Sequence, residues 1–422
     1  MTFKSARKRL FLVPLLLGTF LLSSTLQAQT QTKPIRIGFG MAQTGALAGN
    51  GKAAQLAMEI WREEINKKGG LLGRQVEFVS YDDQSNPSLV PGIYTKLIDS
   101  DKVDLVVSGY GTGQIAPALP TIMQRKMAFI TLFGTNPNGK FGYERYFQMM
   151  PNGLEPAVGL TYGFFEAAMS INPKPTTVAF AGGDAEYSAL ALEGASENAK
   201  KYGLKVVYDK SYPMSTTDFA PVVRGIQATN PDIVFVAGYP PDSVGIIRAA
   251  NEVGLKTKVF GGPMIGLGYA AVKKQLGPLL NGVIGYELYV PEPTVKFPGI
   301  EAFLKKYQDR AKKEGVDELG FYLPPYGYAM MEILGQSIEK TGGLDQGKLA
   351  EYMHTTKFST VVGDIKFGAN GEWQVGRPLY VQYRGVVGND IEQFRKAGKA
   401  PIMFPRDMKS GELKFPYEEA RK

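Results

Sequence analysis

Short apolar runs alternate with amphipathic segments along the first part of the chain. Each apolar run is bounded by glycine, proline or polar residues, which is typical of a buried strand. Strands are expected over residues 35–40, 76–81, 103–108 and 128–132. Helices are expected over residues 53–68 and 87–98 and in a third segment that runs towards Arg125. This βαβα order predicts a parallel sheet that helices cover on both faces.

The same alternation restarts after residue 150. Helices are expected over residues 154–169, 185–202, 218–229 and 243–253. Strands are expected over residues 177–181, 205–208, 232–237 and 258–260. The two halves share no sequence repeat, so they are alike in architecture only. We therefore predict an α/β protein with two similar lobes of ordinary domain size.

The last third of the chain is less regular. Helices are expected over residues 299–313, 324–340 and 346–354, and strands over 364–367 and 379–383. The two strands alternate like an antiparallel pair around Asn370-Gly371. A chain that returns after building two lobes fits lobes joined by several crossings, with a cleft between them. The predicted division is residues 34–151 plus 286–358 for lobe 1, 152–285 plus 359–400 for lobe 2, and a tail at 401–422.

The N-terminus has the features of a cleaved signal peptide. Four basic residues precede an apolar run over residues 10–22, which is short for a membrane anchor, and Ala28 offers a cleavage position. The alternative is an uncleaved signal anchor. Removal of residues 1–28 takes four of the 48 Lys and Arg residues and no acid, so 44 remain against 40 Asp and Glu. This near balance predicts no nucleic-acid partner, and the absence of a later apolar run of membrane-spanning length predicts that the mature protein is not membrane-embedded.

Composition restricts the chemistry further. The chain has no cysteine and a single histidine, His354, which excludes disulfides, thiol nucleophiles and multi-histidine zinc sites. Without a cysteine for a lipid tether, the exported protein is expected to be free in the periplasm. Gly38, Gly40 and Gly45 do not form a dinucleotide fingerprint, because Gln43 stands where the third glycine is needed. We expect no cofactor and no metal, and His354 is expected on a surface helix rather than in a catalytic triad.

The turn after the third predicted strand is the strongest candidate site. Ser108-Gly109-Tyr110-Gly111-Thr112-Gly113-Gln114 enters a helix, and the free N–H groups of a helix start can meet an anion. The end of the next strand, over residues 131–137, adds Phe133 and Thr135. Ligands of open α/β sheets bind at the carboxyl ends of the strands. The competing interpretation is an ordinary glycine-rich connection with helix caps.

Two tyrosines occupy the equivalent turns of the second half. Tyr187 follows the strand expected over 177–181, and Tyr239 follows the strand expected over 232–237. Each can offer flat contact area and a hydroxyl to a ligand in the cleft. Tyrosine is common in loops, so neither residue is a strong signal alone.

Several segments together resemble one family, the periplasmic leucine/isoleucine/valine-binding proteins. They are Met41-Ala42-Gln43-Thr44-Gly45-Ala46-Leu47-Ala48-Gly49-Asn50-Gly51, residues 65–73, Asp82-Asp83, Asn86-Pro87, residues 232–258, and Gly363-Asp364-Ile365-Lys366-Phe367 with Asn370-Gly371. The resemblance implies the type I fold of periplasmic binding proteins, with two Rossmann-like lobes joined by several hinge crossings. It also implies the function of an ABC importer's binding protein, which captures a small carboxylate ligand, closes on it and delivers it to an inner-membrane permease. A monomer is expected.

The resemblance also assigns site residues. The family's carboxylate-holding loop falls on Thr112, Gly113 and Gln114, with Phe133 and Thr135 at the next strand end. The second lobe's aromatic contacts fall on Tyr187 and Tyr239.

One position departs from the family. The acid that pairs with an amino-acid ligand's ammonium is replaced by Met264. Either another acid (Asp184, Glu186 or Asp242) takes that role, or the ligand is an apolar or aromatic acid without an amine. The alternatives from other classes are an α/β enzyme acting on a small amide or acid, and a ligand sensor built on the same fold.

Overall fold

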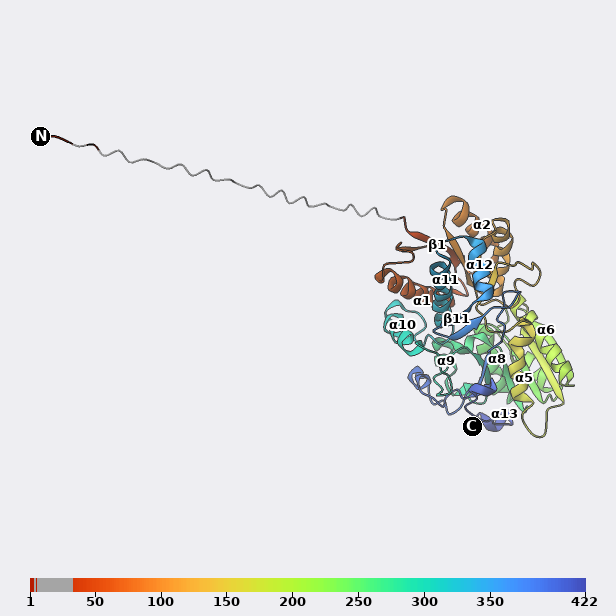
Figure 1. Ribbon diagram of the computed structural model, residues 1–422. Helices are drawn as coiled ribbons and strands as arrows, with labels where there is room; N and C mark the ends of the chain where they lie inside the picture. The colour runs from red at the N-terminus through yellow and green to blue at the C-terminus, as the bar shows by residue number, and fades with distance from the viewer. Residues whose placement is uncertain (4, 6–32) are drawn as a thin grey trace.

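The computed structural model describes residues 1–3, 5 and 33–422. The predicted signal peptide therefore lies almost entirely outside the described residues. The described chain forms two lobes, one above the other in Figure 1, each built around its own sheet.

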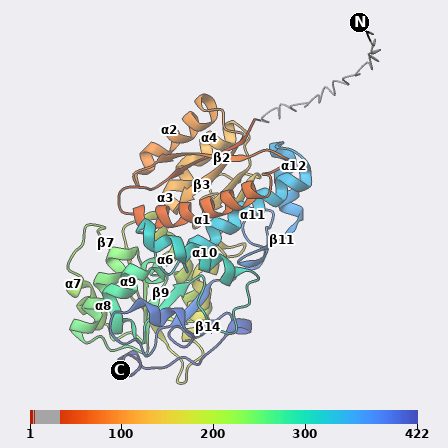
Figure 2. The same ribbon diagram turned by 90° about the vertical axis from the view of Figure 1, so that its left-hand side faces the viewer.

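The first lobe contains a five-stranded, wholly parallel sheet with the order β2-β1-β3-β4-β5. Its strands are β1 (Ile35–Met41), β2 (Val76–Asp82), β3 (Leu105–Tyr110), β4 (Phe129–Leu132) and β5 (Tyr146–Gln148). The helices around it are α1 (Ala48–Lys67), α2 (Val90–Thr95), α3 (Thr112–Ile115), α4 (Leu119–Gln124), α10 (Ile300–Glu314), α11 (Pro324–Thr341) and α12 (Gln346–Thr355). Neighbouring residues of β3 face opposite sides: Val106 packs into the cluster under α2 and α4, and Val107 into the cluster under α1. Figure 2 shows α1 and α11 side by side, and the two helices are in contact.

The second lobe contains a seven-stranded sheet with the order β14-β13-β10-β9-β8-β6-β7. Its parallel strands are β6 (Thr177–Gly183), β7 (Lys205–Tyr212), β8 (Ile233–Ala237), β9 (Val259–Gly262) and β10 (Ile284–Glu287). Two further strands, β13 (Leu379–Gln382) and β14 (Ile402–Phe404), extend it with antiparallel pairing. The helices of this lobe are α5 (Pro156–Ala168), α6 (Glu186–Lys201), α7 (Ala220–Gln227), α8 (Pro240–Val253), α9 (Ala270–Leu276) and α13 (Tyr417–Ala420).

Three segments connect the lobes, as the predicted fold class requires. They are residues 149–155, 288–299 and 367–378. The third crossing is hydrogen-bonded to the end of β5: Gln148 N–H donates to the Gly371 carbonyl at 2.9 Å, and the Trp373 indole donates to the Gln148 carbonyl at 2.9 Å. It is joined to the first crossing by the Arg377 N–H, which donates to the Pro151 carbonyl at 2.7 Å. Gly371 has a φ of +77°, and a Cβ there would lie 1.8 Å from the Tyr146 carbonyl oxygen. Only glycine fits where the third crossing touches β5.

The predicted pairing of residues 364–367 with 379–383 is wrong. The first of these segments forms β12 (Gly363–Lys366), which pairs with the short strand β11 (Lys357–Thr360). The second is β13, which is fully buried between β10 and β14. Asn370-Gly371 does make a turn, but it joins only Phe367 to Trp373 before the chain crosses to the other lobe.

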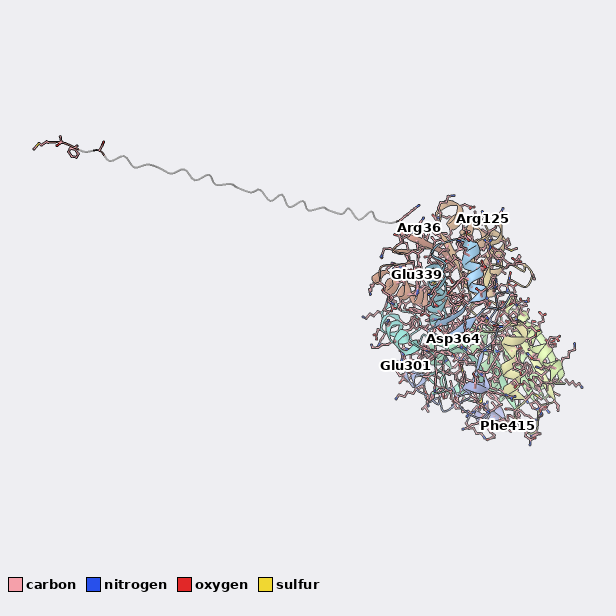
Figure 3. The ribbon with its side chains drawn as sticks, viewed as in Figure 1. Arg36, Arg125, Glu301, Glu339, Asp364 and Phe415 are labelled. Carbon is pink, nitrogen blue, oxygen red and sulfur yellow. The ribbon has the colours of Figure 1, made fainter. Side chains whose placement is uncertain are left out.

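Three boundaries of the predicted lobes differ from the structure. The boundary at residue 286 cuts β10, which belongs to the sheet of the second lobe. The boundary at residue 359 cuts the β11–β12 hairpin, which packs on α11 and α12 in the first lobe. Residues 401–422 are not a separate tail, because they supply β14 and the buried Tyr417 to the second lobe. Figure 3 shows Arg125 at the top of the two lobes and Phe415 of this segment at the bottom.

Candidate functional site

The carboxyl ends of β3 and β4 lie together at the edge of the first lobe that faces the second. Gly111 links β3 to α3 with a φ of +104°, and its N–H donates to the Phe133 carbonyl at 3.1 Å. Thr112 then begins α3, and its Oγ1 accepts the Thr135 N–H at 2.9 Å. Both threonines are almost completely buried, with exposed fractions of 2% and 0%. The predicted carboxylate-binding loop is thus one hydrogen-bonded unit made from two strand ends.

The start of α3 presents donors to this edge. The N–H groups of Gln114 and Ile115 both donate to the Gly111 carbonyl at 3.0 Å. The amides of Thr112 and Gly113 occupy the first helical positions, where no intrahelical acceptor is within reach. Together with the hydroxyl hydrogens of Thr112 and Thr135, they form a set of neutral donors suited to an anion.

Phe133 is held in a strained backbone conformation beside these donors. Its φ is +58°, which a bulky residue adopts at a cost of about 1–2 kcal/mol. Its ring makes edge contacts with Tyr322 and Tyr326, with centroid distances of 5.7 and 5.0 Å. The two tyrosines come from the entry to α11, far along the chain, and they hold the Phe133 ring at the cleft.

The second lobe presents an aromatic pair to the same place. Tyr187 stands in the first turn of α6, and its hydroxyl donates to the Pro263 carbonyl at 2.8 Å. Tyr239 precedes α8, and its ring centroid lies 5.5 Å from that of Tyr187. The chain next to Pro263 is pinned to the end of β8 by a bridge between Gly238 and Met264.

Side chains from both lobes enclose a cavity of about 10 Å³, which is roughly the space of one water molecule. The lining residues are all uncharged, and most carry an aromatic ring or a hydroxyl: Tyr110, Gly111, Thr112, Phe133, Thr135, Met150, Tyr187, Tyr239, Ile265 and Tyr322. The lobes are therefore closed over the site, with their own side chains packed into it.

Five of the eight predicted site residues line this cavity, namely Thr112, Phe133, Thr135, Tyr187 and Tyr239. The remaining three lie beside it. Gly113 is half-buried in the first turn of α3, Gln114 is buried behind it, and Met264 is fully buried next to Ile265, which does line the cavity.

Five other lining residues were not among the predicted site residues. Tyr110 and Gly111 belong to the glycine-rich segment already singled out, and Ile265 follows Met264 directly, so a signal for them was present. Met150 and Tyr322 reach the cavity from the first crossing and from the start of α11. No local pattern marks those two.

The three acids considered as partners for an ammonium do not line the cavity. Asp184 and Glu186 are exposed. Asp242 is buried, and its Oδ2 accepts the Tyr212 hydroxyl at 2.8 Å. Desolvation raises the pKa of Asp242 to about 6, and burial likewise raises the pKa of Tyr110, a cavity residue, to about 12. At neutral pH the cavity therefore offers neutral hydroxyl donors and no carboxylate.

His354 lies on α12, as predicted, but it is half-buried rather than on the surface. Its two ring nitrogens lie 3.2 Å from the Gly368 carbonyl oxygen and 2.6 Å from the Glu144 carbonyl oxygen, and its ring packs on Phe147. It joins α12 to neighbouring loops and lies away from the cavity lining.

Two hydrogen bonds also join the lobes at the mouth of the cleft. Asp317, in the loop between α10 and α11, accepts the Ala270 N–H at the start of α9 at 2.8 Å. The neighbouring Glu318 carbonyl accepts a hydrogen bond from Arg395 of the second lobe at 3.0 Å. Both contacts join the two lobes in this closed arrangement.

A cavity between two α/β lobes, at the carboxyl ends of their parallel strands, is typical of two-lobed ligand-binding proteins. A family model described as "periplasmic binding protein" matches residues 34–383, and the chain belongs to that family. A leucine-, isoleucine-, valine-, threonine- and alanine-binding protein of Pseudomonas aeruginosa is 26% identical over 339 residues, 80% of this chain and 87% of that protein. The Leu/Ile/Val-binding protein of Escherichia coli is 24% identical over 341 residues, 80% and 88% of the two chains.

Solved structures have the same fold. The branched-chain amino acid transporter substrate-binding protein of Streptococcus pneumoniae, in complex with isoleucine, superposes with a TM-score of 0.72 at 20% identity, covering 88% of this chain and 99% of that one. An ABC transporter solute-binding protein from R. palustris, in complex with benzoate, superposes with a TM-score of 0.70 at 18% identity, covering 88% and 95%.

Proposed function

We propose that this protein is the solute-binding component of an ABC importer and that it captures a small carboxylic acid without an amine. The observation that carries the proposal is the composition of the interlobe cavity: two threonines, four tyrosines, one phenylalanine and no charged side chain. Relatives in the family include proteins named for branched-chain amino acids and structures solved with isoleucine or benzoate, so both ligand classes are candidates.

The carboxylate is assigned to the first lobe. The amides at the start of α3 and the hydroxyls of Thr112 and Thr135 are neutral donors at the edge of the sheet. Charge-assisted hydrogen bonds from such donors are about twice as strong as neutral ones. This arrangement holds the anion without a basic side chain.

The absence of a carboxylate from the cavity lining argues against an amino acid. Burial of an ammonium without a charged partner is costly, and the residue aligned with the family's acid is the thioether of Met264. The rings of Phe133, Tyr187 and Tyr239 suit an aromatic or aliphatic body instead.

Closure of the lobes distinguishes the solute-bound protein from the free protein. Contacts from Tyr187 and Tyr239 reach the solute only when the second lobe lies over the first, so the solute stabilises the closed form. An inner-membrane permease then recognises that form. This mechanism needs no chemistry on the solute, in keeping with a binding protein rather than an enzyme.

Export completes the proposal. The family is periplasmic by description, and none of the helices in the part of the chain that the structure describes is long and apolar enough to cross a bilayer. We propose that residues 1–28 are removed after Ala28 and that the mature protein acts as a monomer in the periplasm.

Calorimetry with matched solutes tests the proposal. Phenylalanine and 3-phenylpropionate differ only in the α-ammonium, and so do leucine and 4-methylpentanoate. We expect each amine-free acid to bind at least tenfold more tightly than its amino acid. Tighter binding of the amino acids would reject the amine-free ligand class. No measurable binding of any of the four solutes or of benzoate would reject the proposed function itself.

A further inference from the structure

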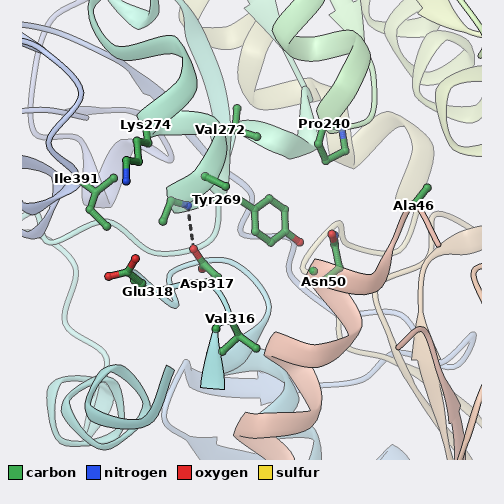
Figure 4. Close-up of a pocket in the computed structure, with 14 residues that line it drawn as sticks. Ala46, Asn50, Pro240, Tyr269, Val272, Lys274, Val316, Asp317, Glu318 and Ile391 are labelled. Carbon is green, nitrogen blue, oxygen red and sulfur yellow. Dashed lines mark hydrogen bonds between the residues drawn. The ribbon is translucent and has the colours of Figure 1, made fainter. Parts of the chain in front are cut away.

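The closed site has less room than a solute needs. Its cavity of about 10 Å³ holds about one water molecule, whereas small-molecule sites enclose roughly 300–1,000 Å³. Binding of an acid therefore requires movement of the lobes, of the side chains that line the cavity, or of both. Figure 4 shows the hydrogen bond at Asp317 that joins the lobes at the mouth of the cleft, where the carboxylate accepts the Ala270 N–H at 2.8 Å. As long as this bond is kept, part of the room has to come from a lining side chain.

Two aromatic side chains in the wall, one from each lobe, are held firmly by their neighbours. The Tyr187 hydroxyl donates to the Pro263 carbonyl at 2.8 Å, which fixes the ring at its far end. The Phe133 ring packs against Tyr322 and Tyr326, with centroid distances of 5.7 and 5.0 Å. Rotation of either ring out of the cavity would break these contacts.

The side chain of Met150, which also lines the cavity, is held less firmly. An unbranched side chain with three rotatable bonds changes its conformation easily. The backbone of Met150 is fixed at the start of the first crossing, because its N–H donates to the Gln148 side-chain oxygen at 3.0 Å and its carbonyl accepts the Asn152 N–H at 2.9 Å. Rotation of the side chain can therefore clear part of the cavity without moving the crossing.

The sulfur of Met150 contacts one of the proposed carboxylate donors. It accepts the Thr135 hydroxyl at 3.8 Å, and both side chains are buried, with exposed fractions of 2% and 0%. A thioether is a weak acceptor, whereas a carboxylate oxygen forms hydrogen bonds about twice as strong as those between neutral groups. The sulfur therefore stands where an oxygen of the bound acid would be the better partner of Thr135.

We propose that Met150 competes with the solute: its thioether fills the carboxylate position of the closed site, and the carboxylate displaces it and takes over the Thr135 hydroxyl. This inference rests on the proposed function. The protein binds an acid only when the Met150 side chain has turned away, so the apparent affinity for every acid is lowered by the fraction of the protein in which Met150 fills the site. Met150 thereby sets how tightly the protein holds its solute.

Shortening of Met150 tests the competition. Met150→Ala removes the thioether and leaves the Thr112 and Thr135 donors in place. By calorimetry we expect this variant to bind benzoate and 3-phenylpropionate at least about threefold more tightly than the wild-type protein does. Met353→Ala is the matched control, because Met353 is also buried but lies on α12, away from the cavity lining. It should bind both acids as the wild-type protein does.

Methyl NMR of the wild-type protein tests the displacement independently. With the methionines labelled at the methyl carbon, the Met150 signal is assigned by its absence from the spectrum of Met150→Ala or Met150→Leu. On saturation with benzoate we expect this signal to shift, because the methyl group leaves the aromatic wall of the cavity. The Met353 signal should stay in place.

The outcomes separate the two proposals. If benzoate binds to the wild-type protein but the Met150 signal does not shift, or if Met150→Ala binds no more tightly than the wild-type protein, this inference is wrong while the proposed function stands. If the wild-type protein binds no acid, benzoate included, the proposed function fails and this inference fails with it.

Discussion

Substitution of Thr112 by valine is the most informative single change at the proposed site. Valine keeps the shape of threonine but removes Oγ1, which accepts the Thr135 N–H at 2.9 Å. Thr135 is fully buried, so its N–H is left without an acceptor, at a cost of about 1–3 kcal/mol in folding free energy. The bound carboxylate also loses one hydroxyl donor.

The effect on binding follows from the lost donor. A hydrogen bond to a charged group contributes about 1.5–3 kcal/mol, which corresponds to about a 10- to 150-fold rise in the dissociation constant. Calorimetry with an amine-free acid measures this rise, and thermal unfolding without ligand measures the loss of stability. Thr112→Ser retains Oγ1 and serves as the matched control.

We expect Thr112→Ser to stay within a fewfold of the wild-type affinity. Wild-type affinity in Thr112→Val would show that the Thr112 hydroxyl does not hold the carboxylate. A serine variant that loses as much affinity as the valine variant would show the same, because serine retains the hydroxyl.

Three further changes test the scaffold around the site. Gly371→Ala places a Cβ 1.8 Å from a carbonyl oxygen, so it should lower the free energy of unfolding by at least about 2 kcal/mol more than Gly388→Ala, which shares a positive φ but has open space. Lys273→Met leaves the buried Glu287 carboxylate, 2.5 Å from the Lys273 ammonium, without its charged partner and with only the Tyr383 hydroxyl as a donor. We expect a cost of about 3–5 kcal/mol in the free energy of unfolding, most of which Lys273→Met/Glu287→Met should recover. The pKa of Asp242 is raised from 3.8 to about 6, so between these pH values the folded protein holds a proton that the unfolded chain has lost. The free energy of unfolding of the wild-type protein therefore falls as pH rises through this range. From pH 5 to 7.5, the free energy of unfolding of Asp242→Asn should rise by about 1–2 kcal/mol relative to that of the wild-type protein.

Urea unfolding measures all three effects. Equal stabilities for the two alanine variants would contradict the steric role of Gly371. A double variant as unstable as Lys273→Met would show that the buried ion pair is not the cause of the loss. Parallel pH profiles for Asp242→Asn and the wild-type protein would contradict the burial of a costly carboxylate.

The sequence was sufficient for the alternating order of most elements in the two lobes, but it did not predict β5, β10, β14 or α9. Strands buried on both faces are continuous apolar runs, and helices between them carry one apolar face, so the two periodicities separate cleanly. The positions of Thr112 and Thr135 followed from the same pattern, since residues after parallel strands gather at one sheet edge. Their mutual hydrogen bond was not predictable, because it depends on the register of β3 and β4.

Other features depend on contacts between distant segments. Tyr322 and Met150 reach the cavity through the packing of α11 and the first crossing, and no local pattern marks them. The β13 segment pairs with β10, almost a hundred residues earlier, rather than with its neighbour across Asn370-Gly371. Asn370-Gly371 predicts a local reversal of the chain, and it does form one. The strand after it nevertheless pairs with β10, because that pairing buries the strand in the sheet of the second lobe.

A crystal structure of the protein with the amine-free acid that binds most tightly is the decisive measurement of where the solute sits. We expect the acid between the lobes, with its carboxylate in hydrogen-bond distance of Thr112 and Thr135 and its body against Tyr187 and Tyr239. An acid bound outside that cavity, or one whose carboxylate points to the second lobe, would show that the first lobe does not hold the carboxylate.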